Sequence, residues 1–361
     1  MLAQGGICVM RDEEDYEPYF EDTMKAGHYE NRKESVEIMI RSSRGVIDHL
    51  LKLGVRFDMN PDGSLNYTRE GAHSRPRICF HKDITGKEIT TVLQKRVREL
   101  PNVTVMEFTA MTDILVSGGA CTGMIAKTEK GEILHIHTRD TVMATGGIGG
   151  LYEHSTNFPC LTGDALAIAK KYGVELENMD YVQIHPTSLY SEKPGRSFLI
   201  SESARGEGAV LLNGRGERFV DELLPRDVVT KAIHAEMERE GSRHVWLSFE
   251  PVGEAQIRNH FPNIYRRCLE EGYDITKEQI PVVPAQHYFM GGIHVDCNSR
   301  TTMDHLYAVG ETSCNGVHGK NRLASNSLLE SLVFAQRAAA SMAEGRKGSI
   351  KYESNYHAAC C

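Results

Sequence analysis

The segment that most constrains this chain is residues 307–330, YAVGETSCNGVHGKNRLASNSLLE. It joins a short apolar strand to a glycine-rich loop, and then to a helix whose first turn carries residues 325–327. Glu311 at the strand end places a carboxylate where it can accept hydrogen bonds from ribityl or ribose hydroxyl groups. The small polar residues at the helix start leave backbone N–H groups for a carbonyl or an anion, and the five-donor fork of Arg322 suits a carboxylate. An ordinary loop and helix cap is the alternative interpretation.

Length and composition favour a soluble enzyme with more than one domain. The chain has 361 residues, of which 40% are hydrophobic, 25% are charged and 33 are glycine, as in a turn-rich α/β protein. A net charge of −8 argues against a nucleic-acid partner. No apolar run approaches the roughly 18 residues that span a bilayer, and no signal peptide precedes Gln4. The nine cysteines lack a CxxC framework, which favours reduced thiols in the cytoplasm.

Hydrophobic periodicity predicts alternating helices and strands. Residues 31–53 repeat apolar positions at helical spacing and end at Gly54, a residue suited to a helix C-terminus. Further helices are expected over residues 88–100, 165–172 and 228–239, the first of them stopped by Pro101. The β segments predicted from composition are residues 102–105, 110–117, 121–128 and 133–138, followed by a buried strand from residue 141 that runs into glycine.

Glycines after that last strand fit a nucleotide cofactor. Glycine lacks a Cβ, so the backbone can approach a pyrophosphate or adenosine closely at a strand's C-terminal edge. The residues concerned are Ala144, Thr145, Gly146 and Gly147. Farther on, Asp164 stands in the acidic first turn of a predicted helix. From the residues alone it is interpreted as a helix-start signal.

The middle of the chain carries side chains that suit a dicarboxylate. Gln183 and His185 share one face of an extended segment, because strand side chains alternate with period two. Arg322 can bind one carboxylate bidentately while His185 and His287 donate to the other. Arg226 follows a proline at a helix start, where helix initiation is its alternative role. A metal site is the rival interpretation of the histidines, but they lack a closely spaced pairing, so we assign no metal.

In their order along the chain, these motifs resemble the succinate dehydrogenase, fumarate reductase and L-aspartate oxidase flavoprotein family. The resemblance covers nearly all of residues 3–345. It implies an α/β fold in which an FAD-binding Rossmann-like domain is interrupted by an inserted α+β capping domain. The implied boundaries are residues 1–179 and 289–348 for the FAD-binding domain, 180–288 for the capping domain and 349–361 for a tail.

The resemblance also implies the site. The arginine at Arg226 is the acid/base that exchanges a proton with the substrate carbon skeleton, with Asp227 and Glu207 as its nearest partners in sequence. The implied active-site residues are Glu70, Gln183, His185, Glu202, Arg226, His287 and Arg322. The implied contacts with noncovalently bound FAD are Ala3, Gln4, Gly5, Gly6, Ala144, Thr145, Gly146, Gly147, Asp164, Glu311, Ser327 and Leu328.

Residues 67–78, YTREGAHSRPRI, followed by Asp83-Ile-Thr-Gly86, resemble the L-aspartate oxidase branch. There the glutamate at the position of Glu70 faces the substrate ammonium, and a carboxylate favours aspartate over succinate or fumarate. A cationic surface loop is the alternative interpretation of this segment.

The resemblance to this branch implies oxidation of L-aspartate to iminoaspartate, with hydride transfer to flavin N5 and oxygen or fumarate as acceptor. The product feeds quinolinate formation in de novo NAD biosynthesis, which implies a functional link to quinolinate synthase. The expected location is the cytoplasm.

Two segments of the family are absent from the sequence as given. One is the GxGxxG strand-turn-helix expected before Gln4, and the other is a C-terminal helical bundle. Since the GxGxxG loop supplies the main pyrophosphate contact, we expect this chain by itself to hold FAD weakly or not at all. A soluble fumarate reductase or succinate dehydrogenase flavoprotein is the alternative enzyme, against which Glu70 argues. A noncatalytic remnant that binds a nucleotide or a partner is the alternative from another class.

Overall fold

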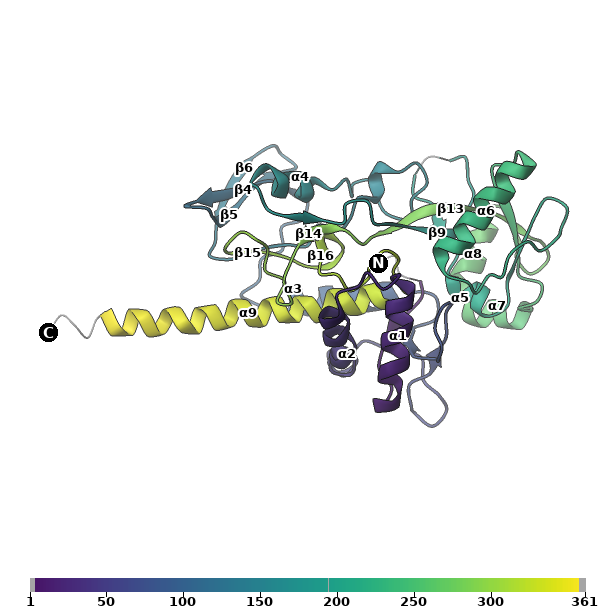
Figure 1. Ribbon diagram of the computed structural model, residues 1–361, viewed down its shortest axis with the longest axis horizontal. Helices are drawn as coiled ribbons and strands as arrows, with labels where there is room; N and C mark the ends of the chain where they lie inside the picture. Colours follow the sequence, from purple (N-terminus) through teal and green to yellow (C-terminus); the bar gives the residue numbers. More distant parts are fainter. Residues whose placement is uncertain (1–3, 194, 357–361) are drawn as a thin grey trace.

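A computed structural model describes residues 4–193 and 195–356, with side chains described as far as residue 345. Within these residues the chain has the predicted mixed α/β architecture, and its buried apolar side chains form three clusters. Each cluster is built around a different group of helices and strands (Figure 1).

The first cluster joins the N-terminal region to the beginning of the last helix. Its strands form an antiparallel sheet in the order β1-β3-β2. The elements of this region are β1 (Ile7–Cys8), η1 (Glu13–Asp15), α1 (Tyr16–Ala26), α2 (Lys33–Leu53), β2 (Tyr67–Thr68), β3 (Ile78–Cys79), α3 (Thr85–Arg98) and α9 (Asn326–Tyr356). Helix α2 ends at Gly54, whose φ of 101° is left-handed and suits glycine, which confirms the predicted helix end.

The second cluster belongs to a five-stranded antiparallel sheet in the order β10-β9-β13-β12-β11 and the helices packed on it. The elements are β9 (Val182–Leu189), β10 (Phe198–Leu199), α5 (Glu202–Gly206), β11 (Val210–Leu212), α6 (Arg226–Glu240), β12 (Val245–Ser248), α7 (Glu254–His260), α8 (Pro262–Glu270) and β13 (Ile280–Phe289). The long paired strands β9 and β13 lead from this region, at the right of Figure 1, back to the rest of the chain.

The third cluster holds the remaining small sheets. Strands β4 (Thr109–Ser117), β5 (Ala120–Thr128) and β6 (Ile133–His137) form an antiparallel sheet. Strands β7 (Thr141–Met143) and β15 (Leu306–Ala308) pair in parallel. Strand β14 (Gly292–His294) lies between β8 (Leu176–Glu177) and β16 (Ser313–Cys314). The helical elements here are η2 (Gly149–Leu151), α4 (Asp164–Lys171) and η3 (Gly310–Thr312).

Three expectations about local structure are wrong or shifted. Residues 102–105 are exposed and pair with no strand among the described residues, so their β-rich composition forms no ladder. The helix expected over residues 88–100 spans Thr85–Arg98. Ser325 lies just before α9 instead of in its first turn, because its φ of 62° is incompatible with a right-handed helix.

The C-terminal prediction also changes. Helix α9 continues to Tyr356, so the predicted tail is helical as far as the structure describes it, and residues 357–361 lie outside the described residues. No proline interrupts residues 326–356, and eight of these residues are alanine or leucine, which favour helix. The domain boundaries at residues 180 and 289 stay predictions.

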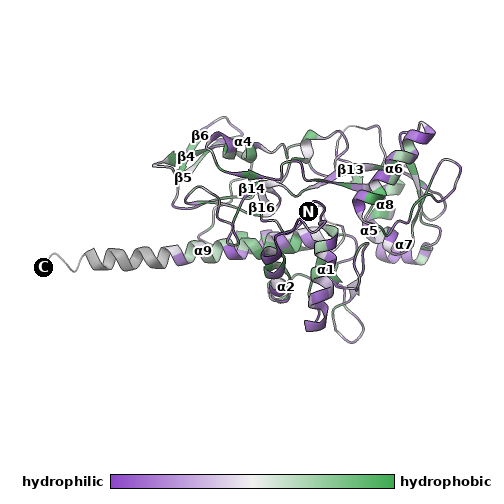
Figure 2. Cartoon of the chain, in the orientation of Figure 1, coloured by the Kyte–Doolittle hydropathy of each residue, from purple (hydrophilic) through white to green (hydrophobic). Residues whose placement is uncertain are grey.

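The described helices mix polar and apolar residues wherever Figure 2 colours them by hydropathy. None of them has the length and apolar character that crossing a membrane requires.

Candidate active site

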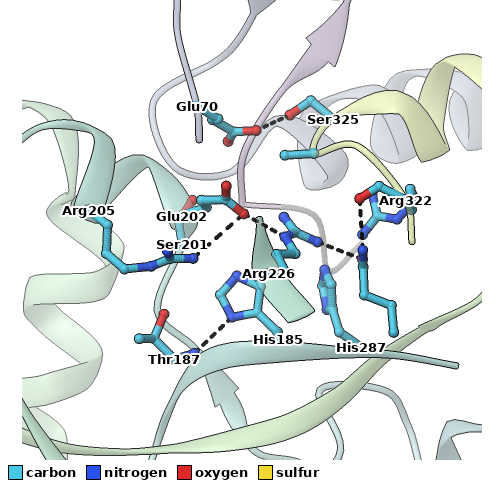
Figure 3. Close-up of polar contacts among 12 residues, drawn as sticks. Glu70, His185, Thr187, Ser201, Glu202, Arg205, Arg226, His287, Arg322 and Ser325 are labelled. Carbon is cyan, nitrogen blue, oxygen red and sulfur yellow. Dashed lines mark hydrogen bonds and ion pairs between the residues drawn. The ribbon is translucent and has the colours of Figure 1, made fainter. Parts of the chain in front are cut away.

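A cavity of about 390 Å³ lies among the N-terminal segment, the strands β9 and β13, and the start of α9. Twelve of the predicted site residues line it: Gln4, Gly5, Gly6, Glu70, His185, Glu202, Arg226, His287, Glu311, Arg322, Ser327 and Leu328. Figure 3 shows the polar side chains converging, with the Arg226 guanidinium above the rings of His185 and His287. Residues far apart in sequence therefore meet at one place.

Arg322 is a buried cation without a carboxylate partner among the described residues. Its Nη1 donates to Ser327 Oγ over 3.0 Å, its Nε makes no hydrogen bond, and its guanidinium stacks over the Tyr288 ring at 4.4 Å. Burial, reinforced by the like charge of Arg226, lowers the pKa of Arg322 to about 10, which leaves it charged at neutral pH. A buried, unpaired guanidinium fork is suited to an anionic ligand.

His185 and His287 form a pair of neutral imidazoles in the cavity wall. Their rings meet edge to face with centroids 5.1 Å apart. The backbone N–H of Thr187 donates to His185 Nδ1 over 3.2 Å, so the proton of the neutral ring is on Nε2, which is buried without a partner. Thr156 Oγ1 lies 2.7 Å from His287 Nδ1. Burial, with Arg226 adding to it, lowers the pKa of both histidines well below the usual value.

Arg226 is held by Glu202 and Gln183. Its Nε donates to Glu202 Oε2 over 2.5 Å and its Nη1 donates to Gln183 Oε1 over 2.8 Å, both in buried surroundings. Gln183 does not line the cavity, but its Nε2 donates to the Arg322 carbonyl over 2.7 Å. It therefore links the two arginines.

Glu202 also connects Arg226 to a second guanidinium, that of Arg205. Arg205 Nη2 lies 3.6 Å from Glu202 Oε2. Burial by itself would raise the pKa of Glu202, but Arg226 and Arg205 outweigh it and lower that pKa. Glu202 is therefore an ionised carboxylate between two buried cations.

The partners expected for Arg226 from sequence proximity are wrong. Asp227 pairs instead with His28 at 3.4 Å, and Glu207 contacts His260 at 2.9 Å. Asp227 lies one residue farther along α6, so its side chain leaves the helix on a different side from that of Arg226.

Glu70 is the second buried carboxylate of the cavity, with 4% of its surface exposed. Ser325 Oγ donates to its Oε2 over 2.6 Å and Ser203 Oγ donates to its Oε1 over 2.9 Å. A Cβ on Gly5 would lie 2.5 Å from Glu70 Oε1, so this glycine allows the carboxylate to enter. Burial, together with the negative charge of Glu202, raises the pKa of Glu70.

The residues predicted for FAD fit a cofactor at the cavity edge. A Cβ on Gly147 would lie 2.4 Å from Glu311 Oε1, so only glycine lets the ATGG segment approach this carboxylate. Gln4 Oε1 is buried without a hydrogen-bond partner and is available to a ligand. Burial raises the pKa of Glu311 to about 7, so a hydroxyl donor would favour its ionised form.

Some predicted FAD contacts lie away from this cavity. Residues 144–147 do not line the cavity; Gly147 approaches it only through its close contact with Glu311, and Thr145 Oγ1 donates to Thr312. Asp164 opens α4, is exposed and accepts a bond from Thr162, so its role toward FAD stays a prediction. Ala3 lies outside the described residues. The described residues contain no cluster of three His, Cys, Asp or Glu side chains that could hold a metal ion.

Sequence reasoning missed several residues that shape the site. Ser203 and Ser325 bind Glu70, Arg205 contacts Glu202, and Tyr288 supports Arg322. Each missed residue adjoins or lies close to a predicted one in the sequence, but only the folded geometry shows which neighbour turns toward the cavity.

Comparison with known proteins places the chain among flavoproteins. A model of the FAD binding domain family matches residues 1–328. L-aspartate oxidase of Clostridium perfringens is 51% identical over 339 residues, which are 94% of this chain and 77% of that protein. L-aspartate oxidase of Neisseria meningitidis is 42% identical over 354 residues, covering 95% of this chain and 70% of that protein.

Solved structures give the same fold. A quinol fumarate reductase variant from E. coli matches with a TM-score of 0.86 and 32% identity, covering 97% of this chain and 67% of that chain. A quinol-fumarate reductase with menaquinol molecules matches with a TM-score of 0.89 and 34% identity, covering 95% of this chain and 63% of that chain.

Proposed function

We propose, because the chain belongs to the L-aspartate oxidase family of FAD-binding flavoproteins, that it catalyses the FAD-dependent oxidation of L-aspartate to iminoaspartate. The observation that carries the proposal is Glu70, a buried carboxylate in a cavity that also holds an unpaired buried arginine and two neutral imidazoles. A dicarboxylate with one ammonium group complements these charges. Glu311, Gly147 and Gln4 would hold the cofactor at the edge of the cavity.

The substrate carboxylates are bound at two places. Arg322 supplies a guanidinium fork to one carboxylate, and His185, which lines the cavity and has no protein partner for its Nε2 proton, donates to the other. His287 lies beside His185 and completes that second position. The ammonium group then faces Glu70, which fixes both the orientation and the identity of the substrate.

We assign proton transfer in this reaction to Arg226 and its partner Glu202. Oxidation of L-aspartate to the imine removes a hydride from C2 and one proton from the substrate. FAD, when bound, supplies the two-electron acceptor for the hydride. A guanidinium is already protonated, so Arg226 can take up the substrate proton only as it passes its Nε proton to the ionised Glu202, whose Oε2 lies 2.5 Å away and which is thereby neutralised.

Glu70→Gln is the direct test of this function. The substitution keeps the shape and removes the charge that pairs with the substrate ammonium, so aspartate oxidation should fall while fumarate reduction is largely retained. A buried charge-assisted contact contributes about 1.5–3 kcal/mol, or roughly 10- to 150-fold in kcat/KM. The measurement is kcat/KM for L-aspartate and for fumarate in the FAD-loaded protein.

A matched control is Glu236→Gln, because Glu236 is a buried carboxylate of α6 that pairs with Arg239 outside the cavity. This variant should leave the ratio of the two activities unchanged. Equal losses with both substrates in Glu70→Gln would assign Glu70 a structural role and remove the main support for aspartate as the substrate.

Fumarate reduction is the second candidate function, favoured by the structural match to fumarate reductases. The arginine and histidine groups would serve it equally, since fumarate has the same two carboxylates. Glu70 favours aspartate because fumarate carries no cation to pair with that buried carboxylate.

The cellular setting forms part of the proposal. Iminoaspartate is the precursor that quinolinate synthesis consumes in de novo NAD formation, so quinolinate synthase is the proposed functional partner. The proposed location is the cytoplasm, which suits a reactive imine that the next enzyme uses directly.

A further inference from the structure

Two buried residues next to Glu70 take no part in the chemistry described above. His73 is 6% exposed and Arg77 is 0% exposed, and neither lines the cavity. Burying a cation and an imidazole away from water is unfavourable unless neighbouring groups satisfy them. Both residues belong to the 67–78 segment, so their partners show what this segment does besides presenting Glu70.

Arg77 is anchored from the N-terminal helices. Its Nη2 donates to Asp15 Oδ1 over 3.0 Å and its Nη1 donates to Asp22 Oδ2 over 2.6 Å. The guanidinium lies 4.9 Å from the centre of the Tyr19 ring. These contacts fix Arg77 relative to η1 and α1, and its Nη1 is also directed at His73.

His73 connects the anchored Arg77 to the residue before Ser325. Arg77 Nη1 lies 3.0 Å from His73 Nδ1, and since arginine has only donors, Nδ1 must be the acceptor. The proton of the neutral ring is therefore on Nε2, which donates to the Ala324 carbonyl over 3.0 Å. Cys8 Sγ donates to the same carbonyl over 3.4 Å.

The Ala324 carbonyl belongs to the peptide that leads into a strained residue. Ser325 has a φ of 62°, which an L-residue seldom adopts without surrounding support. In this conformation Ser325 Oγ accepts from Gly6 N over 3.2 Å and donates to Glu70 Oε2 over 2.6 Å. The backbone N–H of His73 also donates to the Glu70 carbonyl over 3.3 Å. Together these hydrogen bonds form a network that runs from Arg77 through His73 and Ser325 to Glu70.

We infer that His73 and Arg77 are positioning residues that hold Ser325 in its left-handed conformation and so keep the Glu70 carboxylate directed into the cavity. This inference rests on the proposed role of Glu70 in selecting the substrate ammonium group. It makes His73 a determinant of substrate choice that never touches the substrate.

The protonation state and tautomer of His73 can be measured by NMR on the unmodified full chain labelled with ¹⁵N-histidine. The signal of His73 is assigned as the one that disappears in His73→Gln. Burial and the neighbouring Arg77 lower the pKa of His73 to about 4. The signal should therefore show a neutral ring protonated at Nε2 that does not titrate between about pH 5.5 and about pH 8. A ring protonated at Nδ1, or one that titrates in this range, would contradict the hydrogen-bond network around His73, whatever the substrate is.

Substrate choice is tested with a leucine and a glutamine at position 73. His73→Leu removes both hydrogen bonds, whereas glutamine offers one acceptor and one donor, as the neutral imidazole does. The ratio of kcat/KM for L-aspartate to kcat/KM for fumarate should fall in His73→Leu by about 3-fold or more, up to the roughly 10- to 150-fold expected for loss of the Glu70 contact. His73→Gln should recover most of the ratio.

The matched control is His81→Gln, because His81 lies three residues beyond the 67–78 segment, faces Asp58 at 3.4 Å and does not line the cavity. It should leave the ratio unchanged. Equal loss of both activities in His73→Leu, with an unchanged ratio, would show a purely structural role and overturn the inference. If the unmodified protein fails to prefer aspartate, the proposed function is wrong. The NMR result still tests the hydrogen-bond network around His73 independently.

Discussion

In protein saturated with FAD, replacing Arg226 with lysine should remove most turnover without displacing the cofactor. The lysine keeps one positive charge but loses the planar fork that contacts Glu202 and Gln183 at the same time. Positioned acid–base groups contribute about 10²- to 10⁴-fold to a rate, so a loss of that order in kcat is expected. Fumarate reduction should suffer most, because it needs a proton delivered to carbon. Steady-state kcat with both substrates provides the measurement.

Arg239→Lys is the control for this substitution, because Arg239 lies on the same helix, is half-exposed and pairs with Glu236. Its kcat should remain near the unmodified value. A near-normal kcat in Arg226→Lys would restrict Arg226 to an electrostatic role or to starting helix α6.

The second large effect is expected from Arg322→Leu, which should raise KM far more than it lowers kcat. The substitution removes the buried cation that lacks a protein carboxylate partner and leaves an apolar side chain against Tyr288. Losing one partner of a buried charge pair costs about 2–5 kcal/mol, or roughly 30- to 5,000-fold in affinity. Binding of an unreactive dicarboxylate inhibitor should weaken by a similar factor.

Arg322→Lys separates charge from geometry at this position. Lysine should restore part of the affinity, since it supplies a charge but no bidentate fork. An unchanged KM and inhibitor affinity in Arg322→Leu, together with a lower kcat, would place Arg322 in the chemical step instead of in substrate binding.

Much of the candidate site could be predicted from the sequence, because its residues are concentrated in short motifs. Period-two alternation placed Gln183 and His185 on one face of β9, and both are buried toward the arginines. The glycines at Gly5 and Gly147 mark places where a Cβ would collide with a carboxylate. Such steric requirements are local, so they leave a visible pattern in the sequence.

The relay at Arg226 could not be predicted in the same way. Sequence proximity favoured Asp227 and Glu207, but the ionic partner of Arg226 is Glu202, 24 positions away on α5. Two helices bring these residues together, and their packing depends on the whole second cluster of buried residues. The sequence predicted Ser325 as part of a helix start but not its bond to Glu70, because contacts with Gly6 and Glu70 from distant segments support its left-handed conformation.

The strand expected at residues 102–105 shows the limit of composition. The segment has β-forming residues, yet every residue in it is exposed, and none pairs with another strand in the described part of the chain. A strand is stabilised by its partners more than by its own sequence, so composition alone cannot decide the outcome.

The most direct test of the proposed function is anaerobic reduction of the flavin in the protein saturated with FAD. L-Aspartate should bleach the visible flavin absorption, and succinate should do so much more slowly, because only aspartate brings an ammonium group to the buried Glu70. Bleaching by both compounds at equal rates, or none with L-aspartate while FAD is bound, would contradict the proposed function.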